Sequence, residues 1–457
     1  MELPAVNLNS SHQVLGKSNI SAKNSSNPFE LKTLQVEITT KCNFECKMCL
    51  HAQNSLISQE MSIDLFEKIA ESLFPTLEHL ILYGVGEPLT HPDFLSILQI
   101  SRKFLPHKAK LEFTTNGSLL TSEYLNLILQ YHIDRIIVSI DSPFIAKIKQ
   151  MREGFTNEVF DNLIYLANEY HAGKIGEIAI ETIISKENLY DLPFLIDFCS
   201  KNGIPQIFFS HLLPYTNDME RKSIFLPISE EAFRILDEIG KIGWEILDQI
   251  ILTPKYHKIL IADKHSQIKK LLQTIEMIKN KEIELDLHKI TDVQTKKYSI
   301  LEAKKMFTYL SELAEQKRIK IDLPPLFAES TKRECPFAAR NALFITYDGS
   351  IIPCYNFGHE HSMIINHHER IIHPYILGSI ADPETSCKKV LELHSILTSI
   401  STKVPYCGDC VYSTQNCYYI SDNTGDCYGN QPGCNECPYS TGFVKCLFDF
   451  NSNRRKS

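Results

Sequence analysis

The sequence predicts an α/β fold built from repeated strand–helix units. Short apolar runs alternate with longer runs of helical character through six units. This order is typical of parallel strands joined by helices that cover the sheet. The expected strands are 34–39, 79–83, 110–114, 135–140, 178–184 and 206–210. The expected helices are 63–73, 94–104, 123–131, 158–170 and 192–202.

Local composition divides the 457 residues into four segments. Residues 1–30 are rich in Ser and Asn and are expected to form a flexible tail. The strand–helix units fill 31–215, and a cysteine-dense, loop-rich region fills 331–457. Between them, 216–330 is rich in Lys, Glu and Ile and predicts a helical insertion. Its two apolar helix faces are Ile268, Leu271, Leu272, Ile275 and Ile278, and then Ala303, Phe307, Leu310 and Ala314.

Charge and hydropathy exclude several classes of protein. With 47 Lys and Arg against 55 Asp and Glu, the net charge of −8 argues against general nucleic-acid binding. No apolar run approaches the ~20 residues of a membrane span, and the N-terminus has no apolar signal core. We therefore expect a cytoplasmic protein that binds neither membrane nor nucleic acid. Fourteen cysteines in a reducing cytosol favour metal ligation over disulfides.

A CxxxCxxC triplet directly follows the first expected strand. Its cysteines are Cys42, Cys46 and Cys49. Soft thiolates gathered in one loop suit a [4Fe–4S] cluster. Three ligands leave one iron of the four free to bind another molecule. The alternative is a zinc loop, but zinc sites usually pair CxxC with a second CxxC or with histidines, and no such partner lies nearby.

This triplet resembles that of the radical S-adenosylmethionine (SAM) superfamily, whose members cleave SAM at the free iron to make a 5′-deoxyadenosyl radical. The resemblance implies a partial (β/α)6, TIM-like barrel with its chemistry at the carboxyl ends of the strands. Met48 occupies a position that is often aromatic in the superfamily and lies near adenine. Methionine is apolar and adaptable enough to take that place.

Further residues match the superfamily's SAM-binding positions. The segment Gly84-Val85-Gly86-Glu87 resembles its GGE motif, which implies that Glu87 and the backbone around Gly84 and Gly86 bind the SAM amino group. Ser139 and Asp141 end the fourth strand and resemble a polar pair that contacts the ribose and methionyl parts of SAM. Arg152 matches a basic residue that can pair with the SAM carboxylate. Ordinary turns and a surface arginine are the structural alternatives.

The C-terminal region has ten cysteines, and nine of them form a dense array once Cys387, in helix-like surroundings, is set aside. Residues 348–350, Asp-Gly-Ser between two apolar runs, predict a hairpin that brings Cys335 and Cys354 together. The remaining cysteines are Cys407, Cys410, Cys417, Cys427, Cys434, Cys437 and Cys446. The array resembles the SPASM domain, which holds auxiliary iron–sulfur clusters. Structural zinc held by the two CxxC pairs is the alternative.

The SPASM pattern implies two groups of ligands. Cys335, Cys354 and Cys427 would hold the first auxiliary cluster. Cys407, Cys410 and Cys417 would begin the second, which Cys437 or Cys446 would close. Cys434 has no place in that pattern, and because two cubanes need at most eight thiols, one of the nine is spare or one cluster is unusual.

Local sequence such as Pro353-Cys354-Tyr355 resembles a SPASM subfamily of tungsten-cofactor oxidoreductase maturases. We expect a radical SAM maturase with one SAM-binding [4Fe–4S] cluster, one or two auxiliary clusters, and a reductase, ferredoxin or flavodoxin as electron donor. A ribosomally made peptide or a protein ranks first as substrate, and maturation of a tungsten-cofactor oxidoreductase ranks second. A non-catalytic iron–sulfur carrier is the alternative of another class. No residue is assigned as acid or base for the substrate step.

Overall fold

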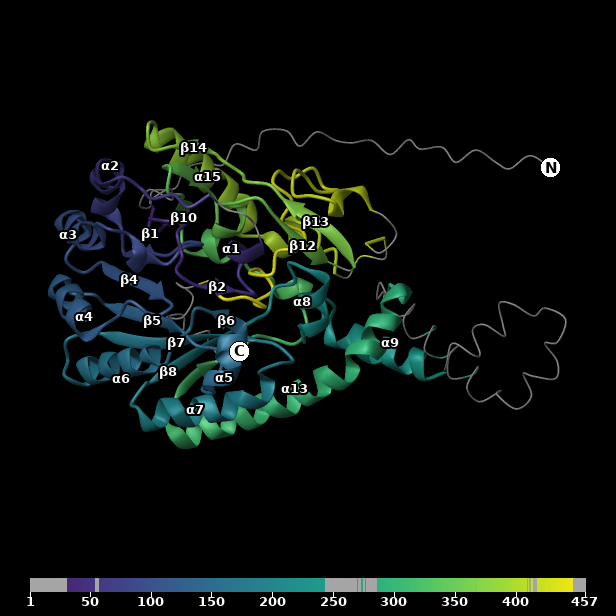
Figure 1. Cartoon of the computed structure of the whole chain (residues 1–457). Coiled ribbons are helices and arrows are strands. Elements are labelled where there is room, and N and C mark those ends of the chain that lie inside the picture. Colours follow the sequence, from purple (N-terminus) through teal and green to yellow (C-terminus); the bar gives the residue numbers. More distant parts are fainter. Residues whose placement is uncertain are drawn as a thin grey trace.

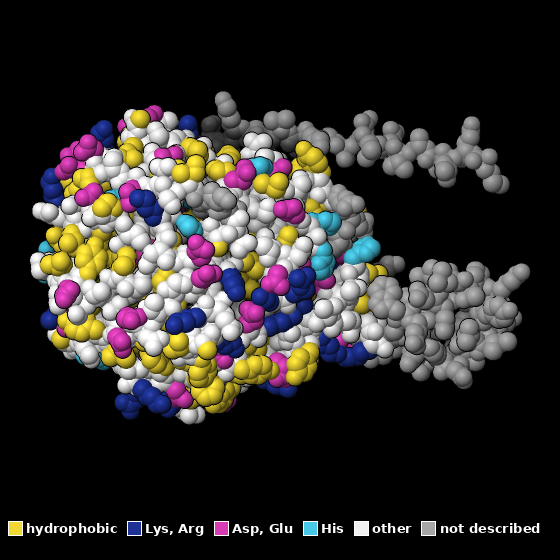
Figure 2. All heavy atoms as spheres, in the orientation of Figure 1, with side chains coloured by type: hydrophobic (Ala, Val, Ile, Leu, Met, Phe, Trp, Pro, Cys, Tyr) yellow, Lys and Arg dark blue, Asp and Glu magenta, His cyan; other side chains and the backbone are white. Residues whose placement is uncertain are grey.

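The computed structural model describes residues 31–53, 57–242, 286–365, 367–408 and 417–446, with single positions 269, 273, 276, 410, 412 and 413. The predicted apolar face at 268–278 therefore lies outside the described residues. Within them, helices surround a long curved sheet, and the C-terminal region lies against one side of it (Figure 1). Figure 2 shows charged side chains of both signs interspersed over the visible face. Among the described residues, no helix is long and apolar enough to cross a membrane.

The six predicted strands form the parallel centre of the sheet in their sequence order. They are β1 (Thr33–Val36), β3 (His79–Leu82), β4 (Lys110–Thr115), β5 (Arg135–Ser139), β7 (Glu177–Ile184) and β8 (Gln206–His211). In register, Thr33 lies opposite His79 and Ser139 opposite Glu181. Because all six strands run the same way, the loops that follow them meet at one edge. The prediction of an α/β fold with parallel strand–helix units is confirmed.

The predicted helices also form, with nearly the expected bounds. Ser62 caps the first of them by accepting a hydrogen bond from the Leu65 amide, and Thr121 caps the third through the Tyr124 amide. These helices are α2 (Ile63–Leu73), α3 (Phe94–Phe104), α4 (Ser122–Ile128), α6 (Glu158–His171) and α7 (Leu192–Lys201). Shorter helices between and after them are α1 (Leu50–Gln53), α5 (Ile145–Met151) and α8 (Asn217–Lys222).

The sheet extends beyond the six units at both ends. Strand β9 (Lys320–Asp322) pairs in parallel with β8, and β10 (Ala342–Ile345) pairs in parallel with β1. The predicted hairpin forms between β10 and β11 (Ser350–Ile352), and β14 (Gly378–Ser379) completes the order β14-β11-β10-β1-β3-β4-β5-β7-β8-β9. The segments expected as insertion and C-terminal region therefore both contribute strands to the barrel sheet.

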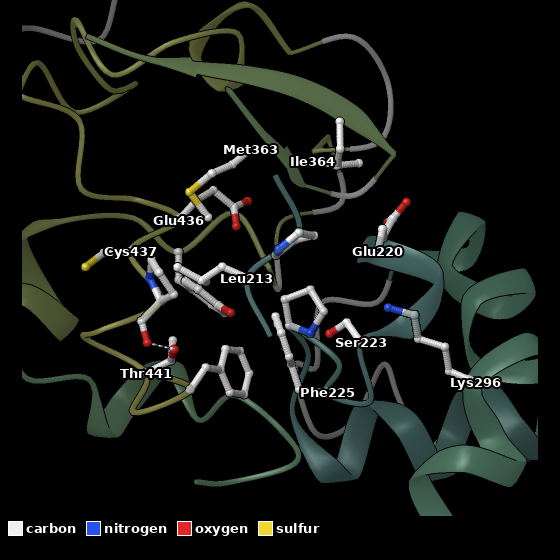
Figure 3. A pocket seen from close by; sticks show the side chains of 15 residues that line it. Leu213, Glu220, Ser223, Phe225, Lys296, Met363, Ile364, Glu436, Cys437 and Thr441 are labelled. Carbon is white, nitrogen blue, oxygen red and sulfur yellow. Dashed lines mark hydrogen bonds between the residues drawn. The ribbon is translucent and has the colours of Figure 1, made fainter. Parts of the chain in front are cut away.

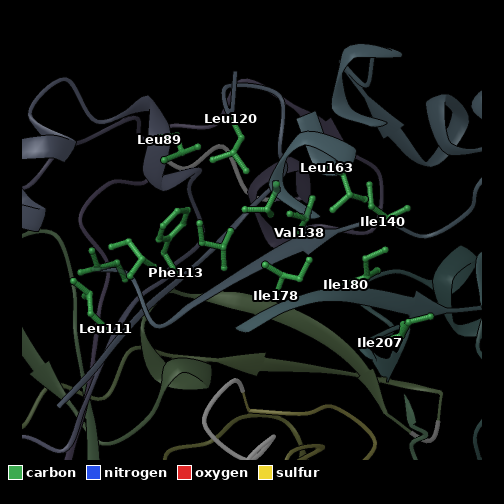
Figure 4. Close-up of a cluster of buried hydrophobic side chains, with 14 of the residues drawn as sticks. Leu89, Leu111, Phe113, Leu120, Val138, Ile140, Leu163, Ile178, Ile180 and Ile207 are labelled. Atoms are coloured by element: carbon green, nitrogen blue, oxygen red, sulfur yellow. The ribbon is translucent and has the colours of Figure 1, made fainter. Parts of the chain in front are cut away.

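The two faces of the sheet bury different partners because side chains alternate along each strand. One set, including Phe113, Val138 and Ile180, packs against the helices (Figure 4). The other set, including Ile137 and Phe208, packs against the C-terminal region. At roughly 25 cal/mol per Å² of buried apolar surface, both interfaces stabilise the fold substantially. The C-terminal region is therefore part of the same packed body.

Helices of the insertion lie along the outside of the barrel (Figure 1). Helix α13 (Ile290–Lys317) packs on α7 and on α9 (Glu230–Ile242). Ala303, Leu310 and Ala314 of its predicted apolar face are buried, and Phe307 is partly buried in the same core. A helix at this position is confirmed.

The C-terminal region consists mostly of loops around a hairpin and a few helices. Backbone pairing attaches it to the barrel, since the His211 amide donates to the carbonyl of Phe443 and the Lys445 amide donates to Ser210 Oγ. Its elements are α14 (Pro336–Ala339), β12 (His361–Ile365), β13 (His368–Ile372), α15 (Pro383–Leu397) and α16 (Ile400–Lys403).

Candidate active site

Cys42, Cys46 and Cys49 line one cavity at the carboxyl edge of the sheet, with a volume of about 170 Å³. The loop that carries them is fixed by the two-residue strands β2 (Glu45–Cys46) and β6 (Arg152–Glu153), which pair antiparallel. Amides of Phe44 and His51 donate to the sulfurs of Cys42 and Cys49 at 3.5 and 3.4 Å. These bonds orient the sulfurs that the sequence singled out.

The three thiols lie in a setting that favours metal binding over solvation. Burial raises the pKa of Cys42 to about 11 and that of Cys46 to about 12. The charges of Glu87 and Cys49 raise the pKa of Cys42 further, and those of Cys49 and Cys42 raise the pKa of Cys46. Arg152 Nη1 lies 3.9 Å from Cys46 Sγ and supplies positive charge. Buried thiols beside a guanidinium suit thiolates that bind an iron–sulfur cluster.

The glycine turn after β3 lies directly against the cysteine loop. A Cβ on Gly86 would stand 2.4 Å from the carbonyl oxygen of Thr39 and 2.5 Å from that of Lys41. The amide of Glu87 donates to the same Lys41 carbonyl at 2.7 Å. Only glycine permits this approach, which places the turn and the cysteines in one wall of the cavity.

A buried carboxylate beneath the turn fixes its other end. A Cβ on Gly84 would lie 2.3 Å from Glu37 Cγ, and Glu37 Oε2 accepts a hydrogen bond from the Val85 amide at 2.8 Å. Glu37 is fully buried, and His359 Nε2 of the C-terminal region lies 2.8 Å from its Oε1. The hydrogen bond with Glu37 helps to raise the pKa of His359 against the lowering effect of burial. The turn is thus supported from both the barrel and the C-terminal region.

Glu87 presents a fixed carboxylate to the cavity. Its oxygens accept hydrogen bonds from the Thr115 hydroxyl at 2.7 Å, the Asn116 amide at 2.6 Å and the Leu89 amide at 3.1 Å. Burial nevertheless raises its pKa to about 7, because these bonds only partly offset desolvation. A cationic ligand group would restore the carboxylate, which suits the amino group of an amino acid.

Arg152 is held toward the cysteines by Asp141. Arg152 Nε donates to Asp141 Oδ2 at 2.6 Å, while Asp141 Oδ1 accepts from the Ile183 amide at 2.8 Å. Arg152 and Ser139 line the cavity, whereas Asp141 is fully buried behind them. Asp141 therefore positions Arg152 and does not line the cavity. Of the predicted pair, only Ser139 faces the cavity.

Met48 lines the same cavity, as do Glu181 and His211 from the fifth and sixth strands. Burial raises the pKa of Glu181 to about 7. Burial lowers the pKa of His211 to about 3, and its Nε2 lies 2.9 Å from the carbonyl of Pro325. A second carboxyl group therefore faces the cavity, beside a histidine that stays neutral at physiological pH.

Four tyrosines complete the cavity wall and were not anticipated from the sequence. Tyr83 and Tyr215 come from the barrel, and Tyr355 and Tyr439 from the C-terminal region. The rings of Tyr83 and Tyr355 lie 5.5 Å apart. Two signals for these residues were available in the sequence: Tyr83 directly precedes the glycine turn, and Tyr355 directly follows Cys354. Tyr439 stands two positions after Cys437.

The C-terminal cysteines form two groups. Burial raises the pKa of Cys354, and the charges of Cys437, Cys434 and Cys335 raise it further. Burial likewise raises the pKa of Cys434, and the charges of Cys437 and Cys335 raise it further. Cys335, Cys354 and Cys434 also belong to one packed cluster, and we take these three thiols with Cys437 as the first group.

The second group contains Cys407, Cys410, Cys417 and Cys427. Burial and the charge of Asp426 raise the pKa of Cys427 most, and the charges of Cys417 and Cys410 raise it further. Burial raises the pKa of Cys407 most, and the charge of Cys410 adds to this effect. The SPASM pattern instead places Cys427 with Cys335 and Cys354 and closes the second cluster with Cys437 or Cys446, and that assignment stays a prediction. The segment 431–437 lies against β13, where the Arg370 guanidinium donates to the Gly433 carbonyl and to Asn435 Oδ1.

The ninth thiol, Cys446, is buried in the core cluster that also contains Cys434. Burial and the charge of Tyr215 raise the pKa of Tyr439 most, and the charge of Cys446 is the next cause. Cys446 therefore lies on the side of the tyrosines. Among the described residues, no three Cys, His, Asp or Glu side chains converge on one point as ligands of a single metal ion do.

The surroundings of the first group fit an anionic cluster. Arg333 and Arg370 are almost fully buried, and both lower the pKa of Cys434. Each has buried guanidinium nitrogens, Nε and Nη1, with no hydrogen-bond partner in the described part of the chain. Unpaired buried charge is costly, and a cluster held by thiolates would compensate it. The donor set and the charge both suit an iron–sulfur cluster.

Comparison with known proteins agrees with this chemistry. Residues 36–188 match the family model described as the radical SAM superfamily. That match covers most of the first expected strand, the next four expected strands and the four helices between them. Residues 36–188 therefore carry a radical SAM domain, and enzymes with this domain use a [4Fe–4S] cluster and SAM.

The chain is similar to several proteins of known role. It is 23% identical over 424 residues to the tungsten-containing aldehyde ferredoxin oxidoreductase cofactor-modifying protein of Pyrococcus furiosus, covering 91% of this chain and 97% of the relative. It is 27% identical over 215 residues to a probable GTP 3′,8-cyclase of Methanococcus maripaludis, covering 46% and 69%. A solved structure of native anSMEcpe with bound AdoMet matches with a TM-score of 0.48 at 14% identity, covering 90% and 95%.

Proposed function

We propose that the protein is a radical SAM maturase that modifies a carbon centre of a peptide or protein substrate. One observation carries the proposal: Cys42, Cys46 and Cys49 share a single cavity with the glycine turn, Glu87 and Arg152. When bound there, the [4Fe–4S] cluster and SAM supply a 5′-deoxyadenosyl radical that removes hydrogen from the substrate.

The residues of the cavity bind and orient SAM. Glu87 and the backbone of the glycine turn receive the amino group, and Arg152, held by Asp141, receives the carboxylate. Met48 packs on the adenine, and Ser139 contacts the polar middle of the molecule. The tyrosines cover the far side of the cavity and exclude water from the reacting atoms.

The domains have different roles. Residues 31–215 generate the radical, and residues 331–457 hold two auxiliary [4Fe–4S] clusters through the two thiol groups. Helix α13 of the insertion packs on α7, outside the central sheet. A reductase, ferredoxin or flavodoxin supplies the electron. Cys335, Cys354, Cys434 and Cys437 would hold an auxiliary cluster near the tyrosine-lined wall, and such a cluster would supply an acceptor for one electron from the substrate radical.

Maturation of a tungsten-containing oxidoreductase is the second candidate. It is favoured by the relative from Pyrococcus furiosus, because that similarity runs through both the barrel and the C-terminal region. The two candidates share their chemistry and differ in the molecule that enters the cavity.

The test is formation of 5′-deoxyadenosine by the reduced, iron-reconstituted protein. Wild type should release it from SAM, and Cys46→Ala should not. Cys387→Ala, at a half-buried thiol of α15, is the control and should behave as wild type. No product from wild type with full iron content would refute the proposal. Neighbouring genes then separate the substrates: a short precursor-peptide gene favours the first candidate, and an aldehyde-oxidoreductase gene favours the second.

A further inference from the structure

One carboxylate of the SAM cavity, that of Glu181, has no partner among the described residues. Glu181 lies on β7, where Ala179, the preceding residue on the same face, belongs to the apolar core that faces the C-terminal region. Nearer the carboxyl edge this face becomes polar, since Glu181 lines the cavity and Ser139 lies opposite it on β5. The Glu181 side chain is partly buried and makes no hydrogen bond or ion pair with any described residue.

The neighbouring charges do not neutralise this carboxylate. Burial raises the pKa of Glu181 to about 7. The Arg152 guanidinium lowers it, but Arg152 is bound by Asp141 at 2.6 Å, and the charge of Asp141 raises the pKa of Glu181 again. In the proposed binding mode the ammonium and the carboxylate of SAM pair with Glu87 and Arg152, so neither of these groups binds Glu181. A desolvated carboxylate without a counter-charge is costly, and a bound cation would compensate it.

The same cavity has an aromatic wall. Tyr83, Tyr215, Tyr355 and Tyr439 line it, and all four pack against the apolar core that faces the C-terminal region. The rings of Tyr83 and Tyr355 lie 5.5 Å apart. Burial raises the pKa of Tyr83, and the charge of Glu181 is the next cause, so this phenol stays neutral. Aromatic faces attract ammonium and guanidinium groups, and they do so more strongly where water is excluded.

The cavity has room for a small cationic group in addition to SAM. It measures about 170 Å³, and a neighbouring hollow of about 580 Å³ shares Met48 and Ile183 with it. With Met48 packed on the adenine, as proposed, the nucleoside end of SAM lies toward that hollow. SAM therefore need not fill the part of the cavity that the tyrosines line.

The space behind Leu213 is not an alternative site for such a group. Leu213 lines both the SAM cavity and this second space, which measures only about 50 Å³ and holds a few water molecules at most. Figure 3 shows Lys296 and Glu220 on the same side of it, so the carboxylate there already faces an ammonium group. A cation brought by another molecule is therefore expected at Glu181.

We propose that Glu181 and the tyrosine wall bind a cationic group of the substrate, namely the ammonium of a lysine side chain or N-terminus or the guanidinium of an arginine. The proposal deepens the proposed function and rests on it in one respect, namely that the cation belongs to the molecule that loses hydrogen. Glu181 pairs with the charge, and the aromatic rings contact both the charge and the methylene groups next to it.

The test is equilibrium binding of n-butylammonium, which mimics a lysine side chain, and of neutral n-butanol to the full-length, iron-reconstituted protein loaded with SAM and kept without reductant. The pH is held above 7, where Glu181 is ionised and the amine is still protonated. Wild type should bind the ammonium about tenfold more tightly than the alcohol, the ratio expected for one charge-assisted contact. Glu181→Gln should lose that preference and still bind the alcohol. Glu177→Gln is the matched control, because Glu177 lies on the same strand with its side chain 38% exposed.

Equal binding of the two probes by wild type, or a preference that survives in Glu181→Gln, would overturn the proposal. So would n-butylammonium binding that is lost when SAM is added, or a SAM affinity that falls in Glu181→Gln as far as in Glu87→Gln, because Glu181 would then belong to the SAM site. Should Glu181→Gln fail to fold, Tyr439→Leu serves instead and should weaken n-butylammonium binding about threefold without weakening n-butanol binding; an unchanged ratio there would equally refute the idea.

Because no reductant is present, these results are independent of 5′-deoxyadenosine formation. Wild type that cleaves SAM without preferring the cation refutes only the binding site, and the converse result refutes only the enzymatic proposal.

Discussion

A methyl group at position 86 tests whether the glycine turn must touch the cysteine loop. The Cβ of Gly86→Ala would stand 2.4 Å from the Thr39 carbonyl oxygen and 2.5 Å from that of Lys41, whereas ordinary contacts begin at 3.4 Å. Both opposing atoms belong to the backbone and cannot rotate away. The turn must therefore retreat by about 1 Å, which costs ~1–3 kcal/mol of stability as overpacking does.

The functional cost should exceed the cost in stability. A misplacement of about 1 Å in a reacting complex lowers rates by ~100-fold, so 5′-deoxyadenosine formation should fall by about that factor. The assay is product release under saturating reductant, with iron content measured in parallel. Gly425→Ala is the control, since its methyl would meet only the Asn430 carbonyl at 3.6 Å. A folded, iron-loaded Gly86→Ala protein with activity within about threefold of wild type would refute the reasoning.

Three further predictions concern charge and ligation. Asp141→Asn leaves the Arg152 charge buried without its carboxylate and should lower the free energy of unfolding by ~3–5 kcal/mol. Glu67→Gln is the control, because Glu67 forms an exposed pair with Lys103, and it should lower the free energy of unfolding by less than ~1 kcal/mol. Denaturant unfolding of both variants measures the two changes. Burial raises the pKa of Glu87 to about 7, so the carboxylate becomes protonated as the pH falls below 7. SAM affinity should then weaken by up to ~tenfold per pH unit, a slope that titrations should find absent in Glu87→Gln and retained in Glu181→Gln. Cys434→Ser should reduce bound iron by about one cluster, and Cys446→Ser should not, as iron and sulfide analysis would show; equal losses would contradict the proposed groups.

The central strands and helices were predictable because their signal is local. Apolar runs and caps lie within each element, so α2 and α3 begin and end where the sequence indicated. The pairing of β10 with β1 joins residues about three hundred positions apart, and no local pattern encodes it. The same limit explains why 320–322 and 342–345 were not recognised as edge extensions of the barrel sheet.

The residues of the candidate site could be predicted where a local sequence motif identifies them. They could not be predicted where the chain turns back and brings distant residues together. Ser139 and Asp141 were expected on one face because side chains alternate along a strand. Strand β5 ends at Ser139, however, so Asp141 lies beyond the strand and turns toward Arg152. The grouping of the C-terminal cysteines stays a prediction for a related reason: spacing gives their order along the chain, while grouping depends on how 431–437 folds back.

The pairing of β10 with β1 also explains how the two cysteine regions come to share one site. It places the chain that follows β11, with Cys354 and Tyr355, beside the chain that follows β3, with Tyr83 and the glycine turn. Glu37 joins the two, since it binds the Val85 amide on one side and His359 on the other. A shift of the C-terminal region would therefore move the support of the SAM-binding turn. Because Tyr355 directly follows a thiol of the first group and its ring packs on Tyr83, the cavity and that group are held at a fixed separation, as electron exchange between them would require.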